Sequence, residues 1–198
     1  MFREIDKVLI TRERIAQRVR EMALEISADL RAELEREGAS IHDEGRLVIV
    51  PILTGSIVFV ADLIRELPMK VSLDLVAVSS YPGESVRSKG AHLESEMPRN
   101  LGDKHVLVLD DILDSGRTMH MVKSLIAKQK PASLRFGVLL DKAERREADI
   151  QADYVGFDIP DEFVVGYGLD YNGYYRNHPE IAVLKPDVLA NADDSGAR

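Results

Sequence analysis

Apolar residues recur along the chain with two different spacings. In residues 11–35 they follow the three-to-four-residue repeat that is typical of an amphipathic helix: Ile15, Val19, Met22, Ile26 and Leu30. Thr11 stands at the start of this run and can cap the helix. Residues 47–53, LVIVPIL, instead form a short continuous apolar run, which indicates a buried strand. Pro51 lacks the N–H that a sheet uses, so we expect the regular part of this strand to end there.

The remaining apolar segments continue the alternation of strand and helix. Further strands are predicted at 71–80, 105–111 and 134–140, and further helices at 57–67 and 118–130. Because the strands show no clear polar alternation, both faces of their sheet should be covered. The pattern therefore predicts an α/β fold with a twisted, mostly parallel sheet and helices on both faces.

Two stretches lack a clear repeat. Residues 81–104 carry many charges together with Pro, Gly and Ser, so we expect a mobile functional loop there. Residues 188–198 end in NADDSGAR, which predicts a disordered tail. A chain of 198 residues can bury one sizeable core, and we expect residues 1–187 to form a single domain.

The composition disfavours several classes of protein. A net charge of −8 argues against broad binding to nucleic acids. The absence of cysteine removes disulfides, thiolate catalysis and zinc-finger sites. The first residues, MFREIDKVLI, lack the apolar core of a signal peptide, and no apolar run reaches membrane-spanning length. We therefore expect a cytoplasmic protein without a membrane partner.

The stretch VLVLDDILDSGRTM, residues 106–119, combines acids with the residues of an anion-binding loop. Asp110 and Asp111 end the predicted strand, and Asp114 follows. The next residues lead into a helix, whose first N–H groups can bind a phosphate: Ser115, Gly116, Arg117 and Thr118. Carboxylates repel a phosphate but accept hydrogen bonds from the hydroxyls of a ribose. A ribose 5-phosphate would satisfy both halves of this loop.

Other interpretations account for fewer of these residues. The acid pair could merely end a strand, and Asp114 could merely cap a helix. A Walker P-loop does not fit, because its lysine-containing motif is absent. A signalling receiver module also places adjacent acids after a strand, but there the strand normally opens the domain. Two further loops, at 54–56 and 79–81, follow other predicted strands, so three distinctive loops should meet at one edge of the sheet.

At this point the stretch resembles the phosphoribosyl-diphosphate-binding signature of the type I phosphoribosyltransferases. Residues 154–177, YVGFDIPDEFVVGYGLDYNGYYRN, are similar over their whole length to the hypoxanthine(-guanine) phosphoribosyltransferases. The motifs LLDK at 139–142 and SSY at 79–81 fit the same family. The resemblance spans roughly residues 5–187. It implies the type I phosphoribosyltransferase fold, with a small hood from chain-terminal segments to which roughly 141–187 contributes.

The resemblance implies a role for each residue of the acidic loop. Asp110 and Asp111 would hold the ribose hydroxyls. Asp114 would lie beside N7 of the purine as general base or acid. The four residues that follow would surround the 5-phosphate: Ser115, Gly116, Arg117 and Thr118.

Two further groups of residues would contact the base and the pyrophosphate. For the base, Lys142 would donate to the 6-oxo group, Phe163 would stack on the ring, and the Val164 backbone would meet the pyrimidine edge. Taken alone, Lys142 is typical of a solvated surface lysine and Phe163 of a core residue. The pyrophosphate would receive backbone donors and one charged side chain: Thr54, Gly55 and Arg176.

A magnesium ion is the implied cofactor. Asp170 would bind Mg²⁺ directly or through water, and the acid pair supplies two further candidate ligands: Asp110 and Asp111. A lid over residues 81–104, with Ser80 and Tyr81 at its start, would close over the site. This lid segment is only loosely similar to the family.

Three positions depart from the family pattern. Glu is usual at the position of Asp110, and Lys is common at the positions of Thr54 and Arg117. At position 54 the change removes a charged side chain but leaves the backbone donor.

The implied function is purine salvage. The enzyme would transfer the 5-phosphoribosyl group from phosphoribosyl diphosphate to hypoxanthine and guanine, giving IMP or GMP and pyrophosphate. Alternatives are a regulator or binding module with little turnover and a relative that acts on another base, such as xanthine. The family resemblance also implies a homodimer or homotetramer. The sequence ranks neither the three 6-oxopurines nor the two assemblies.

Overall fold

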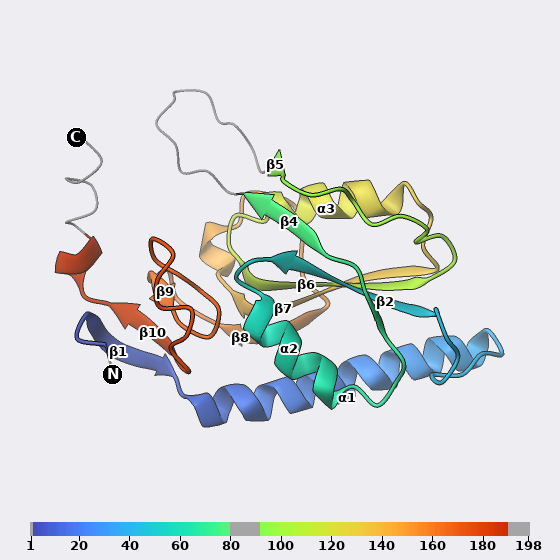
Figure 1. Cartoon of the computed structure of the whole chain (residues 1–198), viewed down its shortest axis with the longest axis horizontal. Helices are drawn as coiled ribbons and strands as arrows, with labels where there is room; N and C mark the ends of the chain where they lie inside the picture. The colour runs from blue at the N-terminus through green and yellow to red at the C-terminus, as the bar shows by residue number, and fades with distance from the viewer. Residues whose placement is uncertain (1, 80–91, 190–198) are drawn as a thin grey trace.

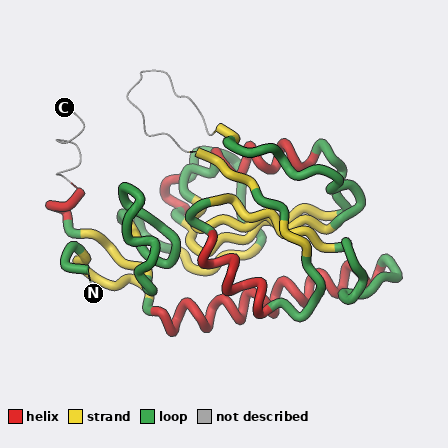
Figure 2. The backbone as a smooth tube through the Cα atoms, viewed as in Figure 1, coloured by secondary structure: helices red, strands yellow, loops and turns green. Residues whose placement is uncertain are grey.

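Seven strands form the main sheet of the computed structural model, which describes residues 2–79 and 92–189 (Figures 1 and 2). The strand order is β5-β4-β2-β6-β7-β8, and β3 also pairs with β2. All pairs are parallel except β4 with β5. The strands are β2 (Leu47–Leu53), β3 (Ser72–Leu73), β4 (Val76–Ser79), β5 (His92–Leu93), β6 (His105–Leu113), β7 (Ser133–Asp141) and β8 (Tyr154–Asp158).

Helices cover both faces of this sheet. One face packs against α1 (Arg12–Arg36) and α2 (Ile57–Glu66), and the other against α3 (Arg117–Ala127). Successive residues of β2 alternate between the two cores: Leu47 and Ile49 face α1 and α2, whereas Val48 and Val50 face the α3 side. This double burial explains the continuous apolar run in the sequence. The predicted α/β architecture is confirmed.

A second, three-stranded antiparallel sheet forms the hood beside the main sheet (Figure 1). It pairs β1 (Ile5–Ile10) with β10 (Ile181–Leu184), and β10 with β9 (Val164–Val165). β8 belongs to the main sheet, so the 141–187 segment enters the hood sheet only from β9 onward. Between β7 and β8 lies one short 3-10 helix, η1 (Ala143–Arg145).

Two strands differ from the sequence prediction. β2 continues through Pro51 to its end, although proline predicts an earlier stop. The Asp74 N–H donates to the Ile49 carbonyl at 3.0 Å. The backbone groups of every second β2 residue, Ile49 and Pro51 among them, are therefore directed toward β3 and β4. The strand expected at 71–80 is interrupted between β3 and β4, beside Pro51. At this interruption the ladder needs no N–H from residue 51, and proline is tolerated.

Part of the predicted lid lies within the described residues. β5 pairs with β4, and the Gln129 side chain donates to the Pro98 carbonyl at 2.6 Å, so residues 92–104 are attached to the main body. Residues 80–91, which include Ser80 and Tyr81, lie outside the described residues, as do 190–198. The lid and the tail therefore stay predictions.

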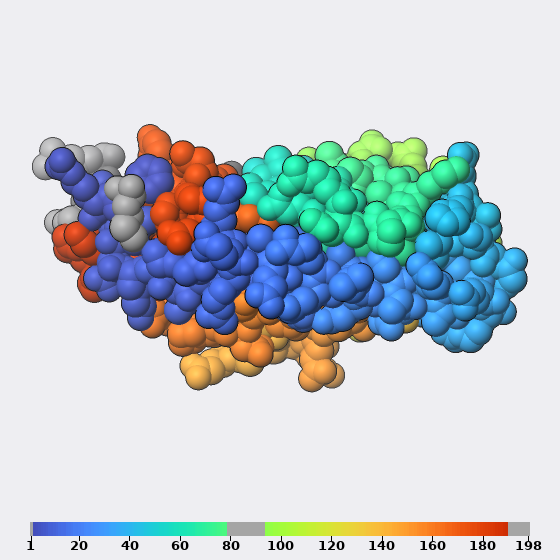
Figure 3. All heavy atoms as spheres, turned by 90° about the horizontal axis from the view of Figure 1, so that it is seen from below, coloured from blue at the N-terminus to red at the C-terminus, as the bar shows by residue number. Residues whose placement is uncertain are grey.

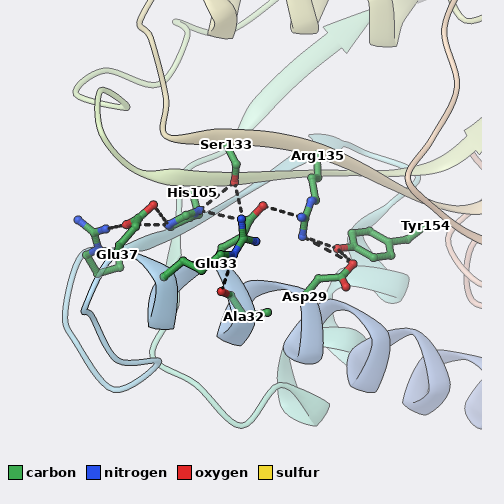
Figure 4. A network of polar contacts seen from close by, with 10 residues as sticks. Asp29, Ala32, Glu33, Glu37, His105, Ser133, Arg135 and Tyr154 are labelled. Atoms are coloured by element: carbon green, nitrogen blue, oxygen red, sulfur yellow. Dashed lines mark hydrogen bonds and ion pairs between the residues drawn. The ribbon is translucent and has the colours of Figure 1, made fainter.

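Polar contacts fasten α1 to the amino ends of two strands (Figure 4). Glu33 pairs with Arg135 of β7 at 2.6 Å and accepts a hydrogen bond from the Ser133 hydroxyl at 3.2 Å. Asp29 accepts a hydrogen bond from the Tyr154 hydroxyl of β8 at 2.9 Å. Burial and this hydrogen bond raise the pKa of Tyr154. These bonds fix α1 on the sheet in addition to its apolar stripe.

One long face of the molecule is crossed by α1, as the blue spheres of Figure 3 show. The Thr11 side chain accepts a hydrogen bond from Arg14 N–H at 3.4 Å, so the predicted cap is present. Leu30 is 4% exposed, whereas Leu24 on the same helix is 69% exposed. Among the residues that the structure describes, no helix, α1 included, combines the length and apolarity that crossing a bilayer needs.

We predict opposite outcomes for two leucine truncations on α1. Leu30→Ala should lower the free energy of unfolding by about 2–5 kcal/mol, because it removes buried methyl groups and leaves a cavity. Leu24→Ala should change it by less than about 0.5 kcal/mol. Urea unfolding followed by circular dichroism measures both values. Equal destabilisation by the two variants would contradict this placement of the helix.

Candidate active site

A cleft of about 710 Å³ opens at the carboxyl ends of β2 and β6. In parallel sheets this edge is the usual place for a ligand. The cleft brings together most of the residues that the sequence predicts for the ribose, the phosphate groups and the metal: Thr54, Gly55, Asp110, Asp111, Asp114, Ser115, Gly116, Thr118, Asp170 and Arg176. Glu94, just after β5, also lines it and was not predicted. No local motif marks this glutamate, since it enters the site through the pairing of β5 with β4.

Two neighbouring carboxylates lie near the end of β6. Asp110 is 8% exposed, and its carboxylate accepts a hydrogen bond from the Asp111 N–H at 3.0 Å. Asp111 accepts one from the Ile112 N–H at 2.9 Å. Burial, together with the nearby Asp111 charge, raises the pKa of Asp110 well above its usual value. Burial also raises the pKa of Asp111, while the charge of Arg176 opposes this shift. The pair therefore favours ligands that donate hydrogen bonds or carry positive charge.

The backbone after β2 is packed against the acid pair. A Cβ atom at Gly55 would lie 1.7 Å from an Asp111 carboxylate oxygen. On its other side, a Cβ atom at Gly168, where φ is +107°, would lie 2.1 Å from the Gly55 carbonyl oxygen. The peptide bond between Leu53 and Thr54 is cis. Only glycine at 55 and 168 allows this close approach of the loop to the carboxylate and to the hood.

The start of α3 forms an open cradle. Gly116 has a φ of +81°, and a Cβ there would lie 2.7 Å from the Ile150 side chain. The Ser115 carbonyl accepts hydrogen bonds from the N–H groups of Glu147 and Ala148, which hold the turn in place. Ser115, Gly116 and Thr118 line the cleft at the start of the helix, where an anion site is expected.

The Arg117 side chain does not line this cradle. It is more than half exposed and pairs with Glu147 at 2.5 Å. The backbone N–H of Arg117 remains at the helix start. Residue 117 could therefore contact a phosphate through its backbone N–H and not through its side chain.

Asp170 and Arg176 form the hood side of the cleft. They pair with each other at 2.7 Å, and Arg176 also donates to the Gly168 carbonyl at 2.7 Å. Asp170 accepts a hydrogen bond from the Gly173 N–H at 2.8 Å. Within residues 2–79 and 92–189, no three His, Cys, Asp or Glu side chains converge as a metal cage. A metal at this position would need ligands from a substrate or water as well.

The predicted base-binding residues follow β7 and β8 and lie outside the lining of the main cleft. Lys142 is only 6% exposed, and its N–H donates to the Leu113 carbonyl at 3.0 Å. Phe163 is 44% exposed and meets Tyr171 edge to face at 5.4 Å. Val164 is buried in β9. The simple expectations for an isolated lysine and phenylalanine are thus reversed, because the lysine is enclosed and the ring is open to solvent.

Two charged residues near this base side were missed from the sequence. Arg145 lies 3.0 Å from an Asp114 carboxylate oxygen, and Asp161 lies 3.7 Å from the Lys142 ammonium. In the sequence, the run around Arg145 is typical of a solvated turn. A signal was nevertheless present, because both residues sit in loops that follow parallel strands and share the edge of Asp114.

Comparison with known proteins agrees with this geometry. A family model described as phosphoribosyl transferase domain matches residues 10–172. A hypoxanthine-guanine phosphoribosyltransferase of Staphylococcus aureus (strain Mu50 / ATCC 700699) is 39% identical over 96% of this chain and 100% of that protein. In a crystal structure, the Bacillus anthracis hypoxanthine-guanine phosphoribosyltransferase carries a HEPES molecule in its active site. It has a TM-score of 0.79 at 40% identity, covering 92% of this chain and 100% of that chain.

A more distant relative superposes as well. The hypoxanthine phosphoribosyltransferase of Trypanosoma cruzi, in complex with the product IMP, has a TM-score of 0.83 at 35% identity. The match covers 95% of this chain and 98% of that chain. Sequence, fold and the position of the acidic loop agree, and this chain belongs to the phosphoribosyltransferase family and, within it, to the hypoxanthine-guanine phosphoribosyltransferases.

Proposed function

We propose that this enzyme transfers the 5-phosphoribosyl group of phosphoribosyl diphosphate to hypoxanthine and guanine, releasing pyrophosphate and forming IMP or GMP. One observation carries the proposal: the Asp110–Asp111 pair, of which Asp110 is buried, and the helix-start cradle of α3 share a single cleft. Lys142, enclosed at the end of the next strand, adds a donor for the 6-oxo group of the base. The named relatives with these activities support the same assignment.

The acid pair and the cradle suit the two ends of a ribose 5-phosphate. The ribose hydroxyls would donate hydrogen bonds to the carboxylates of Asp110 and Asp111. Beyond backbone N–H groups, few donors among the described residues already bond to these carboxylates. The 5-phosphate would accept hydrogen bonds from the N–H groups between Ser115 and Thr118. Arg117 would contribute through its backbone, since its side chain pairs elsewhere.

A magnesium ion fits the charge of this cleft. The donor set is made of carboxylate oxygens only, with the acid pair on one wall and Asp170 on the other. Mg²⁺ favours one or two carboxylates together with substrate phosphates and water. Asp170 would hold the ion directly or through water, with Asp110 and Asp111 as further ligands. When bound, the ion would neutralise charge on the pyrophosphate.

The protein's own groups would stabilise the departing pyrophosphate and take up the base proton. As the bond from ribose C1 to pyrophosphate weakens, positive charge develops on the sugar and negative charge on the leaving group. The Thr54 and Gly55 backbone and the Arg176 guanidinium would stabilise the latter. A purine nitrogen bonds to C1, and Asp114 would accept the proton that the purine gives up. Water must be excluded, because it would hydrolyse the activated sugar.

The enclosed ammonium of Lys142 would select the base. It can only donate hydrogen bonds, and a 6-oxo group accepts them, whereas the amino group of adenine donates. Phe163 would stack on any purine and so would not discriminate. A homodimer or homotetramer remains an expectation from the family.

Turnover of a panel of purine bases tests this function. With phosphoribosyl diphosphate and Mg²⁺, hypoxanthine should be converted to IMP, and adenine should react about 10⁴-fold less well, because its amino group leaves Lys142 without an acceptor. Lys142→Met should lose activity and also the preference for 6-oxopurines. Steady-state kcat/KM for each base gives the answer. Adenine activity within about tenfold of hypoxanthine, or a fully active and selective Lys142→Met, would refute the assignment.

Asp110→Asn should stabilise the ligand-free protein and weaken its binding of phosphoribosyl diphosphate. The raised pKa means that the folded protein binds more protons than the unfolded chain between the two pKa values, so wild-type stability rises as pH falls through that window. At pH 8 the neutral amide removes the buried charge, and the variant should be more stable by about 1 kcal/mol or more, roughly 2–4 °C in Tm. The KM for phosphoribosyl diphosphate should rise about tenfold.

Melting curves of the ligand-free proteins between pH 5 and pH 8 check the stability change. The gap between Asp110→Asn and wild type should narrow at the acid end. Asp158→Asn, an exposed carboxylate at the end of β8, serves as the control and should melt like wild type. A variant Asp110→Asn that melts below wild type at pH 8 would show that the carboxylate is not an unfavourable charge.

Asp114→Asn should lower kcat by about 10²-fold or more while changing KM little, since proton transfer matters only in the transition state. Single-turnover measurements will show whether chemistry limits the rate, and calorimetry should still detect substrate binding. If single turnovers proceed at the wild-type rate, Asp114 is not the acid–base group.

A further inference from the structure

Charged side chains join the loops that follow β6, β7 and β8. Arg145, at the end of η1, places its Nε 3.0 Å from Asp114 Oδ1. Its Nη1 donates to Asp161 Oδ1 at 3.3 Å, and the same oxygen lies 3.7 Å from the Lys142 Nζ. One guanidinium thus connects the two residues assigned to the base, directly in one case and through a shared carboxylate in the other.

At the Asp114 end of this series of charged contacts, one carboxylate oxygen lacks a hydrogen bond from the described residues. Its Oδ1 is shielded from solvent, yet it has no aligned hydrogen bond within the described part of the chain. The contact with Arg145 is therefore mainly a contact of charges. A carboxylate oxygen held in this way keeps its charge partner and still has lone pairs for an incoming N–H. The position suits a group that must wait for a proton from a ligand.

O6 and N7 are adjacent on one edge of the purine. In the free base O6 accepts hydrogen bonds, and a protonated N7 can donate one to a carboxylate. Under the proposed function Lys142 meets O6 and Asp114 lies at N7, so their separation must match that edge. We infer that Arg145 and Asp161 form a brace that fixes the distance between Lys142 and Asp114. Both are positioning residues, since neither needs to touch the base. The brace makes recognition of the 6-oxo group and proton transfer at Asp114 depend on each other.

This inference rests on the proposed function, and it differs from a role in folding. Arg145 and Asp161 are about half exposed. Exposed ion pairs contribute little to stability, so a merely structural pair would leave both Tm and kinetics close to wild type. A brace would instead leave Tm unchanged and alter catalysis, because small errors in placing reacting groups reduce rates strongly.

The test uses the full chain with four single variants, one of them a control, and one double variant. Arg145→Met removes the charge and the fork but keeps much of the side-chain length. Arg145→Lys keeps the charge but cannot bridge two carboxylates in the same way. Asp161→Asn removes the other half. Glu144→Gln, an exposed residue on the same short helix with no part in the brace, is the matched control.

For Arg145→Met we expect kcat with hypoxanthine to fall about tenfold or more, with a smaller rise in the hypoxanthine KM. The preference for hypoxanthine over adenine should fall too, while the KM for phosphoribosyl diphosphate stays within about twofold of wild type. Arg145→Lys should recover part of the loss. The double variant with Asp161→Asn should lose less than the product of the two single losses, because both changes break one connection.

The possible outcomes distinguish a failure of the brace from a failure of the proposed function. A wild-type enzyme that does not turn over any 6-oxopurine would overturn the proposed function. An active wild type with an Arg145→Met variant of unchanged kcat and base preference would overturn only the brace. Fully multiplicative losses in the double variant, or equal losses in Glu144→Gln, would do the same.

Discussion

The parallel register of β6 with its two neighbours determines where the site residues lie. β6 pairs with β2 on one side and β7 on the other, and every ladder runs in the same direction. Because both faces of this sheet are covered by helices, only its edges remain for a ligand. The acid pair lies near the carboxyl end of β6, and the loop around Gly55 and the enclosed Lys142 follow β2 and β7. A slip of one residue in β6 would move each of Asp110 and Asp111 to the face opposite its present one and would remove the cleft.

The sequence predicted best what local chemistry alone specifies. The acidic loop, the cradle at the start of α3 and the long amphipathic helix depend on short-range patterns, and the structure has them where the patterns indicate. Prediction was weaker where long-range contacts decide. Pro51 is tolerated because two short strands on its far side leave a gap, which no local rule indicates. Arg145 and Asp161 resemble surface charges until the strand ends bring them together.

Function and stability oppose each other in the cleft. Burial raises the pKa of both carboxylates, and the Asp111 charge adds to the shift of Asp110, so the pair is unfavourable for the free protein at neutral pH. The hydroxyls of a sugar diol, or a bound cation, would compensate this unfavourable negative charge. Gly55 shows a related constraint, since the loop approaches Asp111 so closely that no side chain fits. The apolar cores on both faces of the sheet supply the stability that tolerates these two features.

The hood sheet has a consequence for the order of events during synthesis. β1 is made before every other described strand, but its only ladder partner among them is β10, which is made after all strands of the main sheet. The strands of the main sheet can pair while translation continues, since all of them are made before β10. β1 must meanwhile stay unpaired, attached to a helix that can already dock. The cleft therefore acquires its hood wall, with Asp170 and Arg176, only after every strand of the main sheet has been made.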